Sequence, residues 1–292
     1  GDWLLHMDAD EVLDPAGARR IREIVDADGE DTDSIELVLA NYCNDTRAWR
    51  WQAASPDDPM ARGYAGYIPA PLLRLFRNHR GFEYREPVHE NITESVIELG
   101  GVIRSESIII HHYGYDGPRS DEKSRIYLDI ARQKVEERPN DPKAWLDLAE
   151  PAFACDNAAL AETACRNAIK LAPLDVGANT MLANLLLNRG DLDEARGILE
   201  RLQQAGIDLP HIGTALGAIA YKQGRLDDAR AQLERVLEQH PQIIQAILYL
   251  ARVHDISGET TQARQCLQCA LSLAPNLTEL RARLQAHAVR MQ

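Results

Sequence analysis

Three acidic side chains stand together near the start of the sequence, directly after a short apolar run. In GDWLLHMDADEVLDP, Asp8 and Asp10 are two positions apart, and Glu11 follows them. Two carboxylates at that spacing can reach one cation once the backbone has left a strand. Oxygen ligands suit Mg²⁺ or Mn²⁺, which proteins commonly hold together with phosphate. The simpler alternative is a polar turn whose Asp caps the next helix, and the spacing alone leaves both interpretations open.

The elements around these acids predict an α/β arrangement for the first part of the chain. The apolar run at residues 3–7 is typical of a buried parallel strand. Asp14 followed by Pro15 predicts the N-cap and first turn of a helix. Further strands are expected at 34–43, 72–78 and 102–115. Residues 54–71 are rich in Pro and Gly and predict a loop. Ligands of open α/β sheets bind beyond the carboxyl ends of strands, which is where the acids stand.

The 292-residue chain is acidic as a whole, with a formal net charge of −13. The excess of acidic side chains is concentrated in the first part of the chain. Residues 1–141 contain 17 basic and 28 acidic side chains, whereas the remainder contains 15 basic and 17 acidic ones. This balance argues against nucleic acid or an anionic membrane surface as a partner. The sequence contains no run of about 18 apolar residues, so it predicts no transmembrane helix.

The five cysteines are odd in number and scattered, so they do not form the pattern of a disulfide framework. They favour a reducing compartment, and we therefore expect a cytoplasmic protein. Cys266 and Cys269 have the spacing of half a zinc knuckle or of a redox pair. Because no second pair of ligands follows them, we expect both to pack within a helix.

The second half of the sequence repeats every 34 residues. The four repeats begin at Pro142, Val176, Pro210 and Ile244. Position 8 is small in each repeat: Ala149, Ala183, Gly217 and Ala251. Position 20 is always alanine: Ala161, Ala195, Ala229 and Ala263. Antiparallel helices approach closely where small side chains face each other, and the glycine found at position 15 of the last three repeats can end the first helix. The pattern resembles the tetratricopeptide repeat, a helix–turn–helix unit of this length.

This resemblance implies an all-α solenoid after the α/β part. The expected repeats are 142–175, 176–209, 210–243 and 244–277. A connecting helix is expected at 119–141, with Ser120 as its cap, and a capping helix at 278–292. The concave face of such a stack is expected to dock a peptide or protein. A spacer or a homodimerisation module is an equally open alternative, because a fold alone does not choose a ligand.

Residues 1–118 resemble the C-terminal part of a known catalytic domain. GDWLLHMDADEVL is similar to the mid-domain motif of inverting family 2 glycosyltransferases, which have the GT-A fold. LLRLFRNHRGFEYREPVHENI (72–92) resembles their arginine-containing strand and His-Glu segment, and IIIHHYGY (108–115) resembles their closing strand. Tetratricopeptide repeats follow such domains in relatives, including bacterial enzymes that glycosylate peptides. Since the first strands and the uracil-binding aspartate of the family are absent, we expect the chain to be a fragment.

The resemblance implies a metal site and a donor site. Asp10 would bind Mn²⁺ or Mg²⁺, and the metal would bridge the two phosphates of a nucleotide-sugar, expected to be a UDP-sugar. Asp8 would contact the metal or the ribose. His112 would be a further metal ligand, because neutral imidazole suits Mn²⁺, while the adjacent His111 points the other way.

The resemblance also implies a base and a phosphate contact. Glu90 would take the proton of a peptide or glycan acceptor as the sugar is transferred with inversion. There are two alternatives. Glu86 could be the base instead, or Glu90 could be a surface residue without a catalytic role. Arg74 and Arg77 would lie on one strand face and bind donor phosphate, unless they pair with the surrounding carboxylates.

Two other classes of protein fit parts of the sequence. The chain could be a non-catalytic docking protein whose repeats follow an incomplete α/β head. Asp-Ala-Asp-Glu-Val at 8–12 also matches the opening motif of haloacid-dehalogenase-like phosphatases. That class needs a lysine near the acids, and Lys123, which is the only lysine before residue 134, falls on a predicted helix. The phosphatase interpretation is therefore the weakest of the three.

Overall fold

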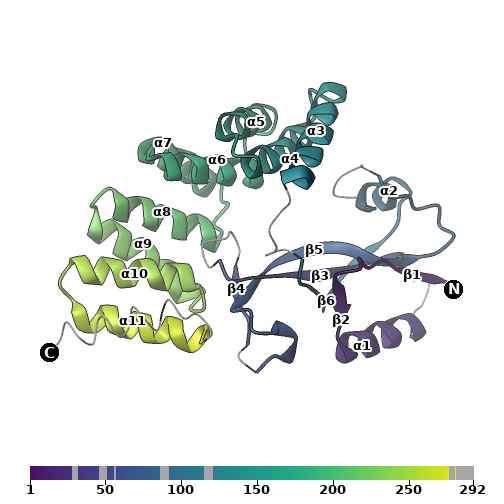
Figure 1. The fold of residues 1–292 in the computed structure, drawn as a ribbon, viewed down its shortest axis with the longest axis horizontal. Helices are drawn as coiled ribbons and strands as arrows, with labels where there is room; N and C mark the ends of the chain where they lie inside the picture. The colour runs from purple at the N-terminus through teal and green to yellow at the C-terminus, as the bar shows by residue number, and fades with distance from the viewer. Residues whose placement is uncertain are drawn as a thin grey trace. The chain divides into compact units, whose positions relative to one another are not determined.

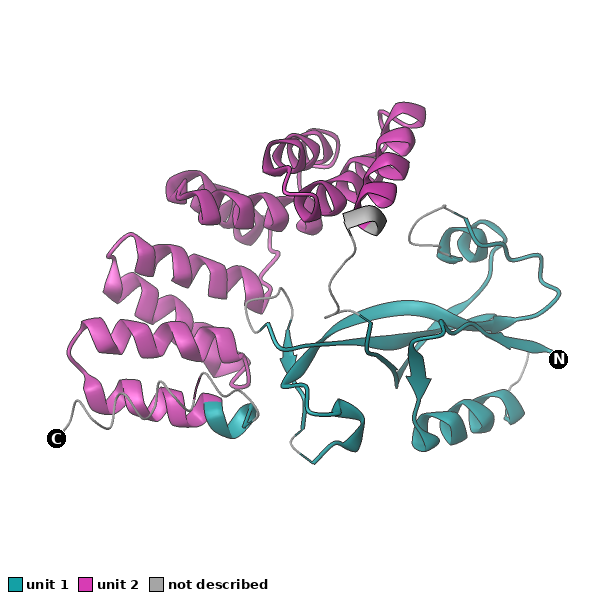
Figure 2. Cartoon of the chain, in the orientation of Figure 1, with its two compact units in different colours: residues 1–117, 271–279 teal, residues 118–270, 280–292 magenta. Residues whose placement is uncertain are grey.

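The computed structural model describes residues 1–27, 32–45, 51–55, 57–85, 92–114, 121–275 and 280. The chain divides into two compact units, coloured separately in Figure 2. We call residues 1–117 with 271–279 the sheet unit. We call residues 118–270 with 280–292 the helical unit.

The sheet unit is built on a mixed sheet, shown in Figure 1. Its described strands are β1 (Trp3–Leu5), β2 (Glu11–Leu13), β3 (Ser34–Cys43), β4 (Gln52–Ala53), β5 (Gly66–Arg77) and β6 (Ile103–His112). The order across the sheet is β1-β5-β3-β6-β2, and β4 pairs with β5. β3 and β6 run parallel, whereas the other pairs are antiparallel. The strand predicted at 34–43 is confirmed as β3.

Short helices pack on the two faces of this sheet (Figure 1). α1 (Pro15–Asp26) packs Ile21 and Ile24 against the central strands. α2 (Thr93–Glu98) packs Val96 against β5 in a separate apolar cluster. The predicted start of α1 is confirmed, because Asp14 Oδ1 accepts a hydrogen bond from the Gly17 amide at 2.6 Å. A 3₁₀ turn, η1 (Pro59–Ala61), lies in the connection before β5.

The expectation that the first apolar run forms a buried parallel strand is wrong. β1 is antiparallel to β5, with Trp3 opposite Arg77. Within the described residues β1 has one strand neighbour and stands at the edge of the sheet. Leu4 and Leu5 consequently remain 43% and 37% exposed. An apolar run indicates a strand but does not say how many neighbours cover it.

The loop expected at 54–71 is also shorter than predicted, because β5 begins at Gly66. Pro69 and Pro71 lie inside the strand, opposite Ala40 and Val38 of β3. A proline ring cannot donate to a strand ladder, so it is tolerated where its nitrogen faces an unpaired edge. β1 pairs with β5 only from residue 75 onward, which leaves that edge of β5 open at both prolines.

The helical unit contains α3 to α10 and most of α11, stacked in chain order (Figure 1). The helices are α3 (Asp121–Glu137), α4 (Pro142–Ala154), α5 (Ala158–Leu171), α6 (Val176–Arg189), α7 (Leu192–Gln204), α8 (Pro210–Lys222), α9 (Leu226–Gln239), α10 (Ile244–Ile256) and α11 (Thr260–Leu273). Each residue at position 1 of the 34-residue pattern begins a helix. Every small residue at positions 8 and 20 is buried. The periodicity therefore predicted the helix pairs correctly.

The turn inside each repeat has a left-handed residue at position 15. Gly190, Gly224 and Gly258 have φ values of 99°, 74° and 76°. The first repeat has Asp156 there, with φ of 58°, so it adopts the same turn without a glycine. Asp is one of the few residues that visit this region because its short side chain can hydrogen-bond locally. The missing glycine therefore does not alter the first repeat.

Helix α3 begins the helical unit. The segment expected to connect the two parts is α3, which buries Leu128, Ala131 and Val135 in the core of the first repeats. Lys134 donates to Asp147 on α4 at 2.7 Å, so α3 covers the open end of the stack. The capping helix expected at 278–292 and the proposed cap Ser120 lie outside the described residues, apart from Leu280. No described helix is both long enough and apolar enough to cross a membrane.

Candidate functional site

A buried arginine gathers the acids that follow β1. Arg74 is a bulged residue of β5, since Leu73 and Leu75 pair with consecutive residues of β3. Its Nη2 donates to Glu11 Oε1 at 2.6 Å and to Asp8 Oδ2 at 3.3 Å. Its Nη1 donates to His6 Nδ1 at 2.8 Å. We call His6, Asp8, Glu11 and Arg74 the arginine cluster. A bulge re-aims a side chain within a strand, which explains how β5 supplies an inward-facing arginine.

Glu11 is the most enclosed acid of this cluster. Its side chain is 1% exposed, and its Oε2 accepts the backbone amide of Asp8 at 2.9 Å. Burial raises the pKa of Glu11 above its usual value, opposed by the Asp8 amide and the charge of Arg74. Sequence analysis assigned no role to Glu11 or His6. No local pattern in the sequence marks Glu11, because its enclosure depends on Arg74 of β5.

The Asp10 side chain lies apart from the arginine cluster and contacts the end of β6. Its Oδ2 is 3.3 Å from Nε2 of His112, the last residue of β6. The pairing of Glu11 with His112 across β2 and β6 brings Asp10 and His112 together, although these two residues are 102 positions apart in the sequence. Nδ1 of His112 is 2.7 Å from Oδ1 of Asn41 on β3. The structure thus joins two of the three predicted metal ligands.

Gly114 lies close against Asp10 and His112. A Cβ atom added at Gly114 would stand 2.2 Å from Asp10 Oδ2 and 2.9 Å from His112 Nε2. Glycine therefore lets the backbone approach a carboxylate oxygen and an imidazole nitrogen closely, and we call this arrangement of Asp10, His112 and Gly114 the cradle. Both donors suit Mg²⁺ or Mn²⁺, which commonly complete their shells with water and phosphate oxygens. The residues present fit such an ion as a two-ligand site.

Asp8 does not join that pair, because its carboxylate faces Arg74. Among the described residues, no three His, Cys, Asp or Glu side chains converge as a closed metal site would require. The arrangement resembles the metal–phosphate pattern, in which the protein supplies one or two ligands. Asp8 therefore pairs with Arg74 rather than with His112.

Arg74 and Arg77 were expected on one strand face, but the bulge at Arg74 breaks the regular alternation of faces between them. The two arginines have different surroundings. Arg77 lies over the ring of Trp3 at 4.8 Å and donates from Nε to the carbonyl of Thr32. Arg74 pairs with carboxylates, as the alternative interpretation held, and whether it also binds phosphate stays a prediction. The predicted base Glu90 and its alternative Glu86 lie outside the described residues.

His111 has a separate environment from its neighbour. It is 4% exposed, and its Nδ1 lies 3.0 Å from the hydroxyl of Tyr42. Burial lowers its pKa. Tyr42 also stacks on Tyr113 with ring centroids 5.3 Å apart. His111 is thus part of an aromatic core, and the two adjacent histidines point to different surroundings, as expected on a strand.

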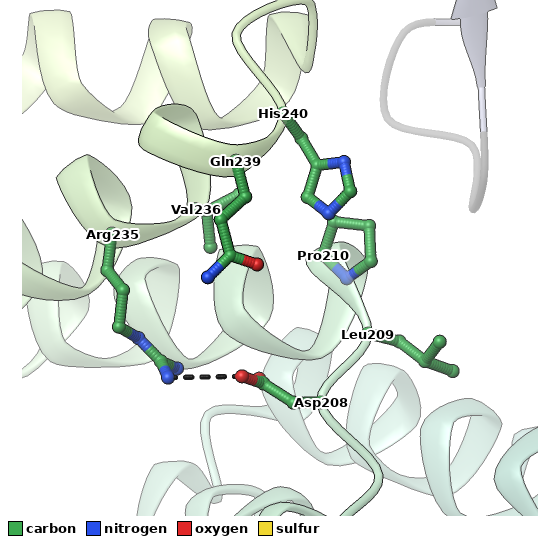
Figure 3. A pocket seen from close by; sticks show the side chains of 7 residues that line it. All are labelled: Asp208, Leu209, Pro210, Arg235, Val236, Gln239 and His240. Atoms are coloured by element: carbon green, nitrogen blue, oxygen red, sulfur yellow. Dashed lines mark hydrogen bonds and ion pairs between the residues drawn. The ribbon is translucent and has the colours of Figure 1, made fainter.

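The helical unit carries a shallow pocket between neighbouring repeats (Figure 3). Its lining residues are Asp208, Leu209, Pro210, Arg235, Val236, Gln239 and His240. Asp208 and Arg235 form an ion pair of 3.2 Å across it, so its main charges satisfy each other. Elsewhere in this unit Cys266 and Cys269 lie on α11. Cys266 packs against an apolar cluster, as expected, whereas Cys269 is exposed.

Comparison with known proteins identifies the repeats. Models of the tetratricopeptide repeat family match residues 164–197 and 214–278. A TPR repeat-containing protein of Synechococcus elongatus is 26% identical over 171 residues, which cover 53% of this chain and 32% of that protein. A pentatricopeptide repeat-containing protein of Arabidopsis thaliana is 35% identical over 82 residues, covering 27% of this chain and 10% of that protein. The chain thus spans a third or less of these relatives.

Two solved structures align with part of this chain. A thermophilic TPR protein of Thermus thermophilus aligns with a TM-score of 0.49 at 19% identity, covering 57% of this chain and 92% of that one. PilW, a type IV pilus biogenesis factor, aligns with a TM-score of 0.48 at 21% identity, covering 56% and 86%. The two matching family models concern the repeats and not a glycosyltransferase. The helical unit of this chain is a stack of tetratricopeptide repeats.

Proposed function

We propose that the helical unit binds a segment of another protein along the first helices of its repeats, α4, α6, α8 and α10. The observation that carries this proposal is an aromatic pair that spans two repeats. Tyr221 on α8 and Tyr249 on α10 meet edge to face, with ring centroids 6.0 Å apart. The guanidinium of Arg252 lies 5.0 Å from the Tyr249 ring. Tyrosine and arginine beside one another are the residues enriched in binding hot spots.

Residues at the position of Tyr221 in the preceding repeats continue this apolar surface along the first helices. Position 12 of the first three repeats is apolar, with Phe153 and Leu187 preceding Tyr221. Phe153 is 49% exposed. The second helices differ, because their charges pair with one another across repeats, as Arg166 does with Glu194 at 2.8 Å. The first helices therefore offer the apolar surface that an extended peptide can cover.

Replacing both tyrosines is expected to abolish most of this binding. We expect peptides selected from a display library on the chain to bind Tyr221→Ala/Tyr249→Ala at least ~30-fold more weakly, since a hot spot contributes about 2 kcal/mol or more. Fluorescence anisotropy with a labelled peptide measures the change. Leu171→Ala, at a 39% exposed position of a second helix, is the matched control and should bind normally. Equal affinity of the tyrosine variant would place the docking surface elsewhere.

A second function is favoured by the cradle at Gly114. We infer that the sheet unit belongs to a transferase that moves a sugar from a nucleotide diphosphate donor, a UDP-sugar, to a peptide or glycan acceptor. Asp10 and His112 would hold Mg²⁺ or Mn²⁺, which stabilises the leaving diphosphate when bound. Asp8 and Arg74 would face the donor. This activity rests on the resemblance described above and on the meeting of Asp10 with His112.

Loss of the Asp10 carboxylate is expected to weaken the binding of Mn²⁺ by at least ~10-fold, because a two-ligand site loses its only charged ligand. Electron paramagnetic resonance of free Mn²⁺ during titration measures this for Asp10→Ala. Gly114→Ala should weaken binding similarly, since its methyl group fills the cradle. Asp193→Ala, whose side chain is 85% exposed on α7, is the control for charge alone. If Asp10→Ala binds Mn²⁺ and the UDP-sugar as the unmodified chain does, the metal role is refuted.

A further inference from the structure

The orientation of one buried amide determines which nitrogen of His112 carries a proton. Asn41 is 9% exposed on β3, between β5 and β6. Its Nδ2 donates to the carbonyl of Ile68 on β5 at 3.2 Å. A carbonyl can only accept, so the amide nitrogen must face Ile68 and the amide oxygen must face the other way. The oxygen is then the atom that lies 2.7 Å from His112 Nδ1.

This contact restricts the imidazole. The Asn41 oxygen can only accept a hydrogen bond, so Nδ1 of His112 must donate one. When the ring is neutral, its single N–H is therefore on Nδ1, and Nε2 carries a lone pair. That lone pair faces Asp10 Oδ2 at 3.3 Å. Two acceptors face each other at this distance, an arrangement that a positive charge between them would stabilise.

We propose that Asn41 is a positioning residue, which holds His112 in the Nδ1–H tautomer so that Nε2 and the Asp10 carboxylate together receive a divalent cation. The cation part of this inference rests on the transferase function proposed above. Residues that donate or accept behind a ligating histidine fix its ring orientation in just this way, and their loss typically lowers metal affinity by about 10–100-fold.

Nuclear magnetic resonance of the full chain, labelled with ¹⁵N in histidine, tests the tautomer without any metal. Spectra at about pH 8.5, well above the usual imidazole pKa, should show His112 protonated on Nδ1. His112→Gln assigns the signal. Asn41→Leu should move the proton toward Nε2, whereas Asn41→Asp keeps an acceptor and should retain the Nδ1–H form. Tyr42→Phe, which alters only the partner of His111, should leave the His112 signal unchanged.

Titration with Mn²⁺ alone tests the consequence. Asn41→Leu should bind Mn²⁺ at least ~10-fold more weakly than the unmodified chain. If Asn41→Leu does not fold, the unmodified chain still decides the question, because His112 protonated on Nε2 would overturn the proposal. An unchanged tautomer and affinity in folded Asn41→Leu would overturn it equally. A correct tautomer with no Mn²⁺ binding in the unmodified chain would overturn the cation site and the transferase function, and would leave the peptide-docking proposal unaffected.

Discussion

Arg74→Met is expected to lower the free energy of unfolding of the sheet unit by about 3–5 kcal/mol at neutral pH, the usual result of removing one member of a buried ion pair. The Glu11 side chain is 1% exposed and has Arg74 as its cationic partner at 2.6 Å. Without the guanidinium, this carboxylate loses its 2.6 Å ion pair and keeps the hydrogen bond from the Asp8 amide at 2.9 Å. Hydrogen exchange of β3 and β6 amides, followed by mass spectrometry, measures the loss within this unit.

The pH dependence of that loss has a definite sign. Burial already raises the pKa of Glu11, and removal of Arg74 raises it further. A group with a raised folded-state pKa stabilises the fold below its unfolded-state pKa, and this contribution disappears as the pH rises through the folded value. The deficit of Arg74→Met should therefore be full at neutral pH and shrink as the pH falls toward the usual glutamate pKa of about 4.3.

Two controls separate the buried charge from other effects of the substitution. Arg74→Met/Glu11→Met replaces the whole pair with apolar groups and should recover most of the stability, because no charge is left uncompensated. Arg104→Met removes an arginine that is 50% exposed on β6 and should cost less than about 1 kcal/mol. Amides of the helical unit serve as an internal reference. Equal exchange in Arg74→Met and the unmodified chain would show that Arg74 does not hold the acids in place.

Gly217→Leu should produce the largest effect in the helical unit. A Cβ at Gly217 would stand 2.6 Å from Cγ of Leu233, which is fully buried on α9. Neither helix can retreat without opening the core of its repeat, so we expect a loss of about 3 kcal/mol. That corresponds to a fall in Tm of roughly 6–12 °C for a unit of this size. Circular dichroism at the helical band follows the transition.

Gly197 offers a matched control within the same unit. It lies inside α7, and a Cβ there would meet no atom within 4 Å. Gly197→Leu should therefore raise stability by about 0.5–1 kcal/mol, because leucine has the better helix propensity. The same change of residue thus has opposite signs at two helical glycines. A stable Gly217→Leu protein would mean that α8 and α9 are not in close contact.

The sequence by itself determined the repeats and several local features. A 34-residue period and a small residue at positions 8 and 20 suffice to predict a tetratricopeptide stack, because each repeat contacts only its neighbours. The cap at Asp14 and the strand β3 were equally readable, since local hydrogen bonding and local apolar patterns determine them. The resemblance to glycosyltransferases stays a prediction about the sheet unit, and Glu90 lies outside the described residues.

Only the tertiary structure decided how the acids of residues 8–11 are used. Their spacing suggested one cation site, but Asp8 and Glu11 turn toward Arg74, whereas Asp10 turns toward His112. The partners come from strands more than 60 positions away, and no local pattern encodes which strands are neighbours. The bulge at Arg74 and the amide of Asn41 depend on the register of β3 with β5 and β6. That register is set by packing of the whole sheet, which is why short motifs could name the residues but not their contacts.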